Sequence, residues 1–314
     1  MTDRVMTSMS ASRAPMRKRT RKESQRRLAF WLLLPAIIAV FGVIIYPVLR
    51  TFYVSLFEVN SALAVSTPFV GLANYVQALT SSDFWAAILR TLYFTVVSTG
   101  VELVFGMMLA LLLNAPLRAR WLFRAVVVIP WAIPTIVNAA MWKGIYNAQY
   151  GALNAALTQL GITDHYISWL GEPFLALNMV ILADAWKTTP LVAFFLLAGL
   201  TSIPNELYES AKVDRASWWR TFRSITVPLL VPSISIVLVL RTVEAFKVFD
   251  IIYAMTRGGP ANGTQTISFY TYISAFSDQN FGLGSALSYI IVIVILILTG
   301  IYLRLLRRSD MSLL

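Results

Sequence analysis

The sequence predicts an all-α, polytopic membrane protein with six transmembrane helices, and three observations support this prediction. The chain has 314 residues, of which 58% are apolar and 13% charged, with a mean hydropathy of +0.69. Soluble domains are about half apolar. Residues 29–48 and 284–303 carry no charge, and a helix of about 20 apolar residues crosses the hydrocarbon core of a bilayer. These runs show no alternation of apolar and polar residues, which favours helices over strands.

The six spans follow one another along the chain. We expect them over residues 28–57, 86–114, 121–144, 174–200, 229–255 and 284–305. The first run is too long for a signal peptide and no small-residue cleavage site follows it, so we interpret it as a retained span. Pro130 and Pro134 are expected to kink or break the third span.

Lys and Arg alternate between the segments that connect these spans. Residues 1–27 hold nine, the turn around Arg120 holds three, segment 201–228 holds four and the C-terminal end holds three, whereas segments 58–85 and 145–173 hold none and segment 256–283 holds one. An excess of basic residues marks cytoplasmic loops. The pattern therefore predicts cytoplasmic termini, a cytoplasmic 201–228 segment and a multi-pass protein of the plasma (cytoplasmic or inner) membrane. It also explains the net charge of +11 without a nucleic-acid partner.

The same pattern predicts three regions. Residues 1–27 form a basic cytoplasmic tail, expected to be disordered and to lie near anionic lipid. Residues 28–306 form the transmembrane domain, which includes the 201–228 segment, and residues 307–314 form a short cytoplasmic tail.

Several kinds of catalytic chemistry have no motif in this chain. There is no G-x-x-x-x-G-K-[ST] loop for nucleotide phosphates and no G-x-S-x-G elbow. The chain has no cysteine, and one histidine, His165, does not make a zinc site. We therefore expect a chain that is not an enzyme, has no catalytic or metal site and binds no cofactor, so that energy for uphill work comes from a partner or an ion gradient.

The 201–228 segment concentrates charge between two apolar runs. Residues 208–228 hold two acids and four bases. Ser202, as a cap, and Pro204 predict the start of a short helix that runs to about residue 213. A second short helix is expected over 216–225, ending near Pro228. The segment places small residues beside large aromatic ones, namely Ser210, Ala211 and Ala216 beside Trp218, Trp219 and Phe222. This is consistent either with a docking surface for another protein or with an amphipathic hairpin on lipid.

Charged residues inside the predicted spans are candidates for function, because each costs about 2.5–3.5 kcal/mol to insert. The fifth span carries Arg241, Glu244, Lys247 and Asp250, the fourth carries Asp184 and Lys187, and the second carries Glu102, for which no partner is evident. On one continuous helix Arg241 and Asp250 point to nearly opposite sides. Two interpretations remain open: the charges pair to brace helices, or they line a polar cavity.

A motif in the 201–228 segment resembles the EAA loop of ABC-importer permeases. That loop reads Glu-Ala-Ala, two residues, Asp-Gly-Ala, five residues, Phe, two residues, Ile, two residues, Pro. The corresponding residues here are Glu209, Ser210, Ala211, Asp214, Arg215, Ala216, Phe222, Ile225 and Pro228. The spacing is kept over all twenty positions. Ser210 replaces an alanine, and Arg215 replaces a glycine, which we expect to shift the corner or to add a contact with an acidic partner surface.

The resemblance extends over about residues 28–306. Segments 69–79, 190–211 and 249–260 are similar to the carbohydrate-uptake branch of these permeases, the maltose, glycerol-phosphate and trehalose type. It implies the type I ABC importer permease fold and import of a sugar, for example the disaccharide trehalose or maltose, or an oligosaccharide. It also implies that the loop docks in a cleft of the ATPase through Glu209, Ser210, Ala211, Asp214, Arg215, Ala216 and Phe222.

The resemblance implies a set of partners as well. This chain would be the MalF-like half of the pathway, together with a second homologous (MalG-like) permease subunit, an ABC ATPase dimer that binds ATP and Mg, an extracytoplasmic sugar-binding protein, and membrane lipid. The face of the fifth span that holds Arg241, Glu244, Ala245 and Val248 would contact the sugar, and we add Asp184 and Lys187 to this candidate pathway.

Two rival functions are expected to behave differently. An ion-coupled secondary transporter would use the intramembrane acids Asp184, Glu244 or Asp250, and would transport alone, without ATP. A non-transporting scaffold or sensor would show no substrate-dependent flux with any partner. The twenty-position motif disfavours both.

Overall fold

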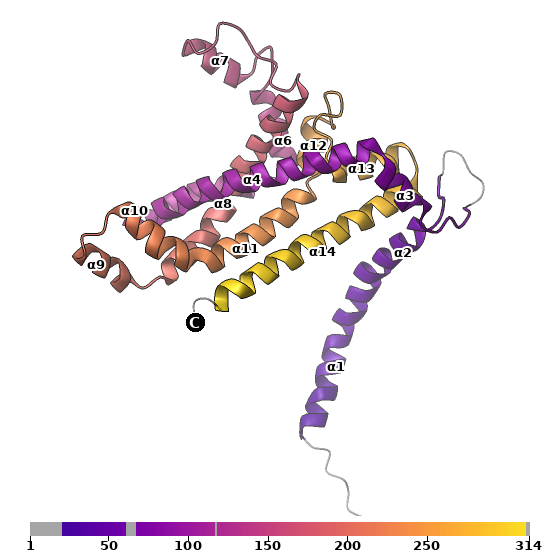
Figure 1. The fold of residues 1–314 in the computed structure, drawn as a ribbon, viewed down its shortest axis with the longest axis horizontal. Coiled ribbons are helices and arrows are strands. Elements are labelled where there is room, and N and C mark those ends of the chain that lie inside the picture. The colour runs from indigo at the N-terminus through magenta and orange to yellow at the C-terminus, as the bar shows by residue number, and fades with distance from the viewer. Residues whose placement is uncertain (1–20, 61–66, 117, 312–314) are drawn as a thin grey trace, which may run out of the picture. The chain divides into compact units, whose positions relative to one another are not determined.

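The computed structural model describes residues 21–60, 67–116 and 118–311, which form helices joined by turns, with no strand among them (Figure 1). The chain divides into two compact units, one ending at Thr51 and the other beginning at Phe52. Five helices of the described residues are long and apolar enough to cross a membrane, and one bent pair of helices makes a sixth span if the pair crosses as a unit. The prediction of an all-α, polytopic membrane protein is confirmed.

The first unit is a single apolar helical segment. It contains α1 (Arg21–Val40), the π-helical turn η1 (Phe41–Ile45) and the beginning of α2 (Tyr46–Ser55). The wide turn precedes Pro47, which has no N–H to donate to a regular helical turn. Residues 21–27 of the expected disordered tail are helical, and residues 1–20 lie outside the described residues.

The second unit begins with the helices that surround the first connecting loops. They are α3 (Ala73–Thr80), α4 (Ser82–Asn114), α5 (Arg120–Ala132), α6 (Thr135–Ile145), α7 (Ala152–Gln159) and α8 (Pro173–Ser202). The Ser81 hydroxyl caps α4 by accepting a hydrogen bond from the backbone N–H of Phe84, which satisfies one free donor of the first turn.

The third span is the bent pair α5 and α6, whose axes differ by 90°. Ile133 has an extended backbone, with ψ 130°, because the ring of Pro134 disfavours the helical conformation of the preceding residue. The expected break is therefore present at the expected proline.

Helices α4 and α8 run in the same direction and pack along most of their length (Figure 1). Tyr93 donates to Asn178, and the Thr188 hydroxyl donates to Glu102, so residues 85 or 86 positions apart meet repeatedly. Close approach is possible because Gly106 faces Val192: a Cβ on Gly106 would lie 2.5 Å from a methyl carbon of Val192.

The remaining helices are α9 (Asn205–Val213), α10 (Trp218–Thr221), η2 (Phe222–Thr226), α11 (Val227–Phe246), α12 (Asp250–Met255), α13 (Ile267–Tyr272), η3 (Ile273–Ser277) and α14 (Phe281–Met311). In Figure 1, α9 and α10 lie at one end of α4, α8 and α11, and α12 and α13 lie at the other end. The C-terminal end of α14 lies toward the α9 and α10 end. The cytoplasmic position of that end stays a prediction.

Two expected boundaries are wrong. The second short helix does not end near Pro228, because the π-helical turn η2 carries the chain past the proline and Trp218–Phe246 forms one long helix. The fifth span does not continue to residue 255, because α11 ends at Phe246 and α12 begins at Asp250.

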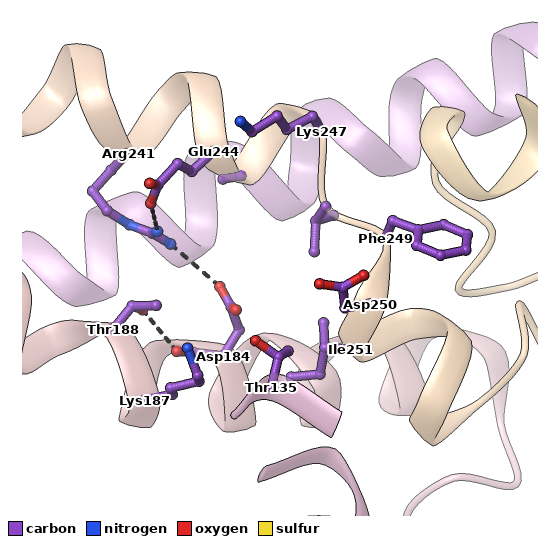
Figure 2. Close-up of a pocket in the computed structure, with 12 residues that line it drawn as sticks. Thr135, Asp184, Lys187, Thr188, Arg241, Glu244, Lys247, Phe249, Asp250 and Ile251 are labelled. Carbon is purple, nitrogen blue, oxygen red and sulfur yellow. Dashed lines mark hydrogen bonds and ion pairs between the residues drawn. The ribbon is translucent and has the colours of Figure 1, made fainter. Parts of the chain in front are cut away.

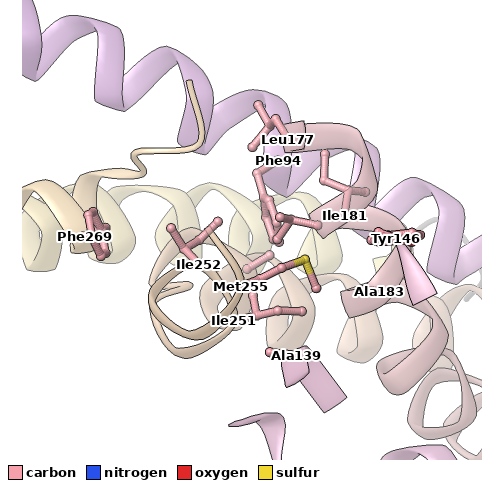
Figure 3. Packing of buried hydrophobic residues seen from close by; sticks show 12 residues of the cluster. Phe94, Ala139, Tyr146, Leu177, Ile181, Ala183, Ile251, Ile252, Met255 and Phe269 are labelled. Carbon is pink, nitrogen blue, oxygen red and sulfur yellow. The ribbon is translucent and has the colours of Figure 1, made fainter. Parts of the chain in front are cut away.

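The buried apolar residues form separate clusters. One brings α4, α6, α8 and α12 together around Phe94, Tyr146, Ile181 and Met255 (Figure 3). A second joins α4, α8 and α11 nearer the α9 end, around residues such as Leu196. A third joins α3, α4, α13 and α14. Along α4, α8 and α11, the buried charges lie between the first two clusters.

Candidate functional site

The candidate site is built around Arg241 on α11, which is 4% exposed. Its Nε lies 2.5 Å from Glu102 Oε2, and its Nη2 lies 2.7 Å from Glu102 Oε1. Nη2 also lies 3.3 Å from Asp184 Oδ2, and Nη1 lies 2.7 Å from Glu244 Oε2. The guanidinium therefore joins three helices, α4, α8 and α11, through three carboxylates.

Glu102 is the residue whose partner the sequence did not reveal. It is fully buried, and besides Arg241 it accepts hydrogen bonds from the hydroxyls of Ser98 at 2.9 Å and Thr188 at 2.7 Å. Its partner lies on another helix, 139 positions away, where spacing along one helix gives no information. The available signal was the opposite charge of two residues isolated within predicted spans.

A polar hollow of about 340 Å³ opens beside Arg241 (Figure 2). It is lined by Thr135, Asp184, Lys187, Thr188, Arg241, Glu244, Ala245, Lys247, Val248, Phe249, Asp250 and Ile251. The structure thus brings together all six residues of the predicted substrate pathway. Glu244 is the most open of the three acids that bind Arg241, with its side chain 50% exposed.

The expectation that Arg241 and Asp250 point to opposite sides is wrong. It assumed one continuous helix, whereas the chain leaves the helical path at Lys247 and re-enters it at Asp250. The break places Lys247, Phe249 and Asp250 at the lining of the same hollow, and in Figure 2 the ring of Phe249 points away from Arg241 and Asp184. The sequence shows neither Gly nor Pro at residues 247–249 that would have predicted this change.

Only one of the ion pairs expected within a helix is found. Arg241 and Glu244 pair at i and i+3. Among the described residues, no ion pair joins Asp184 to Lys187 or Lys247 to Glu244 or Asp250; Asp184 pairs with Arg241 instead. Lys187 and Lys247 therefore line the hollow without a salt bridge to any carboxylate of the described residues.

Three aromatic residues of α8, α11 and α12 do not line this hollow. Phe246 is fully buried, Trp186 packs edge-on against Trp142, and Tyr253 stacks on Phe249. Phe249 is the aromatic residue that lines the hollow.

The 201–228 segment contains a sharp corner after α9. Arg215 has a φ of 53°, in the left-handed region. The backbone N–H of Ala216 donates to Ala211 O at 2.9 Å, and that of Arg215 donates to Lys212 O at 3.1 Å. These two bonds form a Schellman motif, which ends helices and favours glycine at the left-handed position. Arg215 therefore keeps the corner that a glycine would make, at a conformational cost.

The corner leaves a second hollow, of about 440 Å³, between α9 and the start of the long helix. It is lined by Leu207, Ser210, Ala211, Asp214, Ala216, Arg220, Thr221, Ser224 and Ile225. Four of the predicted coupling residues, Ser210, Ala211, Asp214 and Ala216, line it. Glu209 and Arg215 are exposed but do not line it.

Large aromatic side chains stand out from the same segment. Trp218 and Trp219 are 68% and 61% exposed, and both stack with the half-buried Phe222.

The expected cap of α9 by Ser202 is not formed, because the Ser202 hydroxyl donates to Gly199 O of the preceding helix. The serine that caps a helix in this segment is Ser217, whose hydroxyl accepts from the backbone N–H of Arg220 at the start of α10.

The described residues thus place a polar hollow among apolar helices of spanning length and a compact two-helix segment at one end of them. The family described as "Binding-protein-dependent transport system inner membrane component" matches residues 102–310. The chain belongs to this family. It is an ABC-importer permease of the carbohydrate-uptake type and a multi-pass protein of the inner, or plasma, membrane.

Relatives of this chain are sugar-transport permeases. It is 41% identical to the trehalose/maltose transport system permease protein MalF of Thermococcus litoralis, over 90% of this chain and 95% of that protein. It is 36% identical to the sulfoquinovosyl glycerol transport system permease protein SmoG of Agrobacterium fabrum, over 99% of this chain and 100% of that protein. It is 35% identical to the trehalose transport system permease protein SugA of Mycobacterium tuberculosis, over 90% and 89%.

A solved structure shares the fold. The crystal structure of a bacterial ABC transporter that imports the acidic polysaccharide alginate contains a chain with a TM-score of 0.79 and 25% identity, covering 93% of this chain and 99% of that one. The predicted ABC importer permease fold is confirmed.

Proposed function

We propose that this chain is one half of the translocation pathway of an ATP-driven importer for a disaccharide or oligosaccharide such as trehalose or maltose. The observation that carries the proposal is the polar hollow beside Arg241, in a chain whose relatives include trehalose and maltose permeases. Its volume of about 340 Å³ is in the range of small-molecule sites, about 300–1,000 Å³.

The chemistry of the hollow suits a polyhydroxylated ligand. Glu244 Oε2 is held by Arg241, which leaves Oε1 to accept a hydrogen bond from a sugar hydroxyl. Lys187 and Lys247 offer donors to sugar oxygens, and Thr135 offers a hydroxyl that both donates and accepts. Ala245 and Val248 leave room beside these groups.

The 201–228 segment is the proposed contact with the ATPase. Its hollow is lined by small residues, which allow another surface to approach closely, and Trp218 and Trp219 lie exposed on the same segment. Exposed tryptophans beside a concave surface are typical of protein interfaces. The four basic residues of the segment favour an acidic partner surface.

The proposal includes the remaining subunits. An ABC ATPase dimer binds ATP and Mg and performs the hydrolysis, so this chain is not an enzyme and carries no cofactor. A second homologous permease chain forms the other half of the pathway, and an extracytoplasmic sugar-binding protein delivers the sugar. A solved relative of similar fold is a bacterial alginate transporter in complex with a pentasaccharide-bound periplasmic protein.

A pull-down followed by reconstitution tests this function. The chain is tagged at its C-terminus and extracted from native membranes in mild detergent. We expect an ATPase with a phosphate-binding loop and a second six-span chain to co-purify. The purified complex, placed in proteoliposomes with ATP inside and binding protein outside, is expected to accumulate radiolabelled trehalose or maltose.

The same preparation separates the rival function. An ion-coupled transporter would accumulate solute along an ion gradient without ATP, from liposomes that hold this chain alone. That result would contradict the proposal. The structure gives the ion-coupled interpretation little support, because Arg241 already pairs with two of its three candidate acids, Asp184 and Glu244.

A further inference from the structure

The guanidinium of Arg241 has almost no donor left for a ligand. Of its five N–H groups, one at Nε and one at Nη2 bind Glu102, the second at Nη2 binds Asp184, and one at Nη1 binds Glu244. Arg241 thus lies at the hollow but is directed into the protein. The group that it leaves open to the hollow is the carboxylate of Glu244, whose side chain is half exposed.

Glu102 is held in place independently of Arg241. Its Oε1 accepts from Ser98, one turn earlier on α4, and from Thr188 on α8. The Thr188 hydroxyl also lies 2.7 Å from the backbone oxygen of Asp184. Glu102 is fully buried and does not line the hollow. Its carboxylate plane is therefore set by the packing of α4 against α8.

We propose that Glu102 is a positioning residue for sugar binding. By binding Nε and Nη2 of Arg241 side-on, it turns Nη1 toward Glu244 and fixes that carboxylate at the surface of the hollow. The inference rests on the proposed function, in which Glu244 accepts a hydrogen bond from the sugar. It assigns the sugar contact to Glu244, and makes Arg241 and Glu102 the groups that aim it.

This arrangement has a chemical consequence for the ligand. A free arginine in the hollow would attract phosphate or carboxylate groups by bidentate hydrogen bonding. Here the fork of Arg241 is occupied by Glu102, so a ligand meets the acceptor oxygen of Glu244 instead. Hydroxyl donors are favoured at this point of the hollow, and anionic groups are repelled from it.

A double-mutant cycle on the purified transporter complex tests the inference. Dissociation constants for tritiated trehalose and tritiated maltose are measured for wild type, Glu102→Gln, Glu244→Gln and the double variant. Each single variant is expected to weaken binding by about tenfold or more, the size of one charge-assisted hydrogen bond. Because Glu102 acts through Glu244, the dissociation constant of the double variant is expected to be no larger than that of the single variant with the larger loss of affinity.

A second substitution, which removes a neutral hydroxyl and no charge, tests the same role of Glu102 with less risk of a folding defect. Ser98→Ala removes a hydroxyl that lies 2.9 Å from Glu102 and 3.4 Å from Asp184 and leaves every charge of the cluster in place, so it is expected to weaken sugar binding several-fold. Thr95→Val is the matched control on the same helix: Thr95 is buried and its hydroxyl has no partner among the described residues. We expect Thr95→Val to bind sugar as wild type does.

The outcomes separate this inference from the proposed function. If the wild-type complex binds and transports neither sugar, the proposed function is wrong and the inference falls with it. If wild type binds but the effects of Glu102→Gln and Glu244→Gln multiply, Glu102 does not act through Glu244. A lowered melting temperature with unchanged binding in Glu102→Gln and Ser98→Ala would likewise reduce Glu102 to a purely structural role.

Discussion

Arg241 and Glu102, 139 positions apart in the sequence, meet side-on, with Nε 2.5 Å from Oε2 and Nη2 2.7 Å from Oε1. This is the fork geometry in which a guanidinium matches a carboxylate. Both groups are buried. Removing Arg241 leaves Glu102 without a cationic partner, whereas Arg241 without Glu102 still pairs with Asp184 and Glu244. Loss of the pair is therefore expected to lower both the stability of the fold and sugar uptake.

Arg241→Ala is expected to lower both stability and sugar uptake without loosening contact with the ATPase. It leaves Glu102 and Asp184 unpaired, and breaking a buried pair costs about 3–5 kcal/mol. Denaturation of the purified chain in detergent measures the loss, and co-purification measures the ATPase contact. Lys187→Met is the control for stability, because Lys187 lines the same hollow and forms no salt bridge among the described residues. Equal stability of both variants would contradict the role of the cluster.

Glu209→Lys is expected to uncouple ATP hydrolysis from uptake while the protein still inserts. Glu209 is exposed on α9, and reversal of its charge changes the surface that we propose faces the ATPase. Uptake per unit of transporter and sugar-stimulated ATP hydrolysis are compared with those of Glu206→Lys, an exposed acid one turn earlier on the same helix. Wild-type uptake by Glu209→Lys at equal abundance would remove this residue from the interface.

Arg215→Gly is expected to stabilise the corner after α9. Its φ of 53° costs a non-glycine residue about 1–2 kcal/mol, so a glycine there should strengthen the hydrogen bond from Ala216 to Ala211. Hydrogen exchange at the Ala216 amide is expected to slow by roughly fivefold or more, since 1.4 kcal/mol is a factor of about ten. In contrast, Arg220→Gly, inside α10, should speed exchange locally. Faster exchange at Ala216 in Arg215→Gly would show that the arginine side chain stabilises the corner.

Gly106→Ala is expected to destabilise the packing of α4 on α8. The added Cβ would lie 2.5 Å from a side-chain carbon of Val192 and 3.3 Å from the backbone nitrogen of Ala193, and such overpacking costs about 1–3 kcal/mol. Gly100→Ala on the same helix meets nothing within 4 Å and should be neutral or slightly stabilising. Thermal unfolding of the two variants decides the matter, and equal melting temperatures would contradict the close approach.

The topology is directly testable because the chain has no cysteine. Single cysteines at Arg220 and at Tyr150, which is 73% exposed, are labelled with a membrane-impermeant maleimide. In intact cells we expect Tyr150→Cys to react and Arg220→Cys to react only after the membrane is opened. The reverse pattern would place the 201–228 segment outside and exclude ATPase docking.

The sequence predicted the elements that depend on local composition. Apolar runs located the spans, and Pro134 located the bend of the third one. The motif spacing located the corner at Arg215, although it did not show that arginine would keep the left-handed conformation. All six predicted pathway residues line the hollow. Spacing along one helix placed only Arg241, Glu244, Ala245 and Val248 on one face, since Asp184 and Lys187 belong to another helix.

The rest of the site depends on contacts between helices that no local pattern encodes. The bond between Glu102 and Arg241 follows from the packing of α4, α8 and α11. The break at 247–249 brings Lys247 and Asp250 to the hollow although no helix-breaking residue marks it. Both features come from tertiary packing, which selects a conformation that intrinsic propensity leaves undecided.

The pairing of Glu102, Asp184 and Glu244 with one guanidinium also limits which substitutions this protein tolerates. Loss of Arg241 leaves the buried carboxylates of Glu102 and Asp184 without their guanidinium partner, whereas loss of any one acid leaves Arg241 paired with the other two. Arg241 is therefore the residue whose replacement most requires compensating changes. Thr135 and Val248 line the same hollow but belong to no ion pair. Substitutions at Thr135 and Val248 are therefore expected to reshape the hollow at a lower cost in stability than a substitution of Arg241.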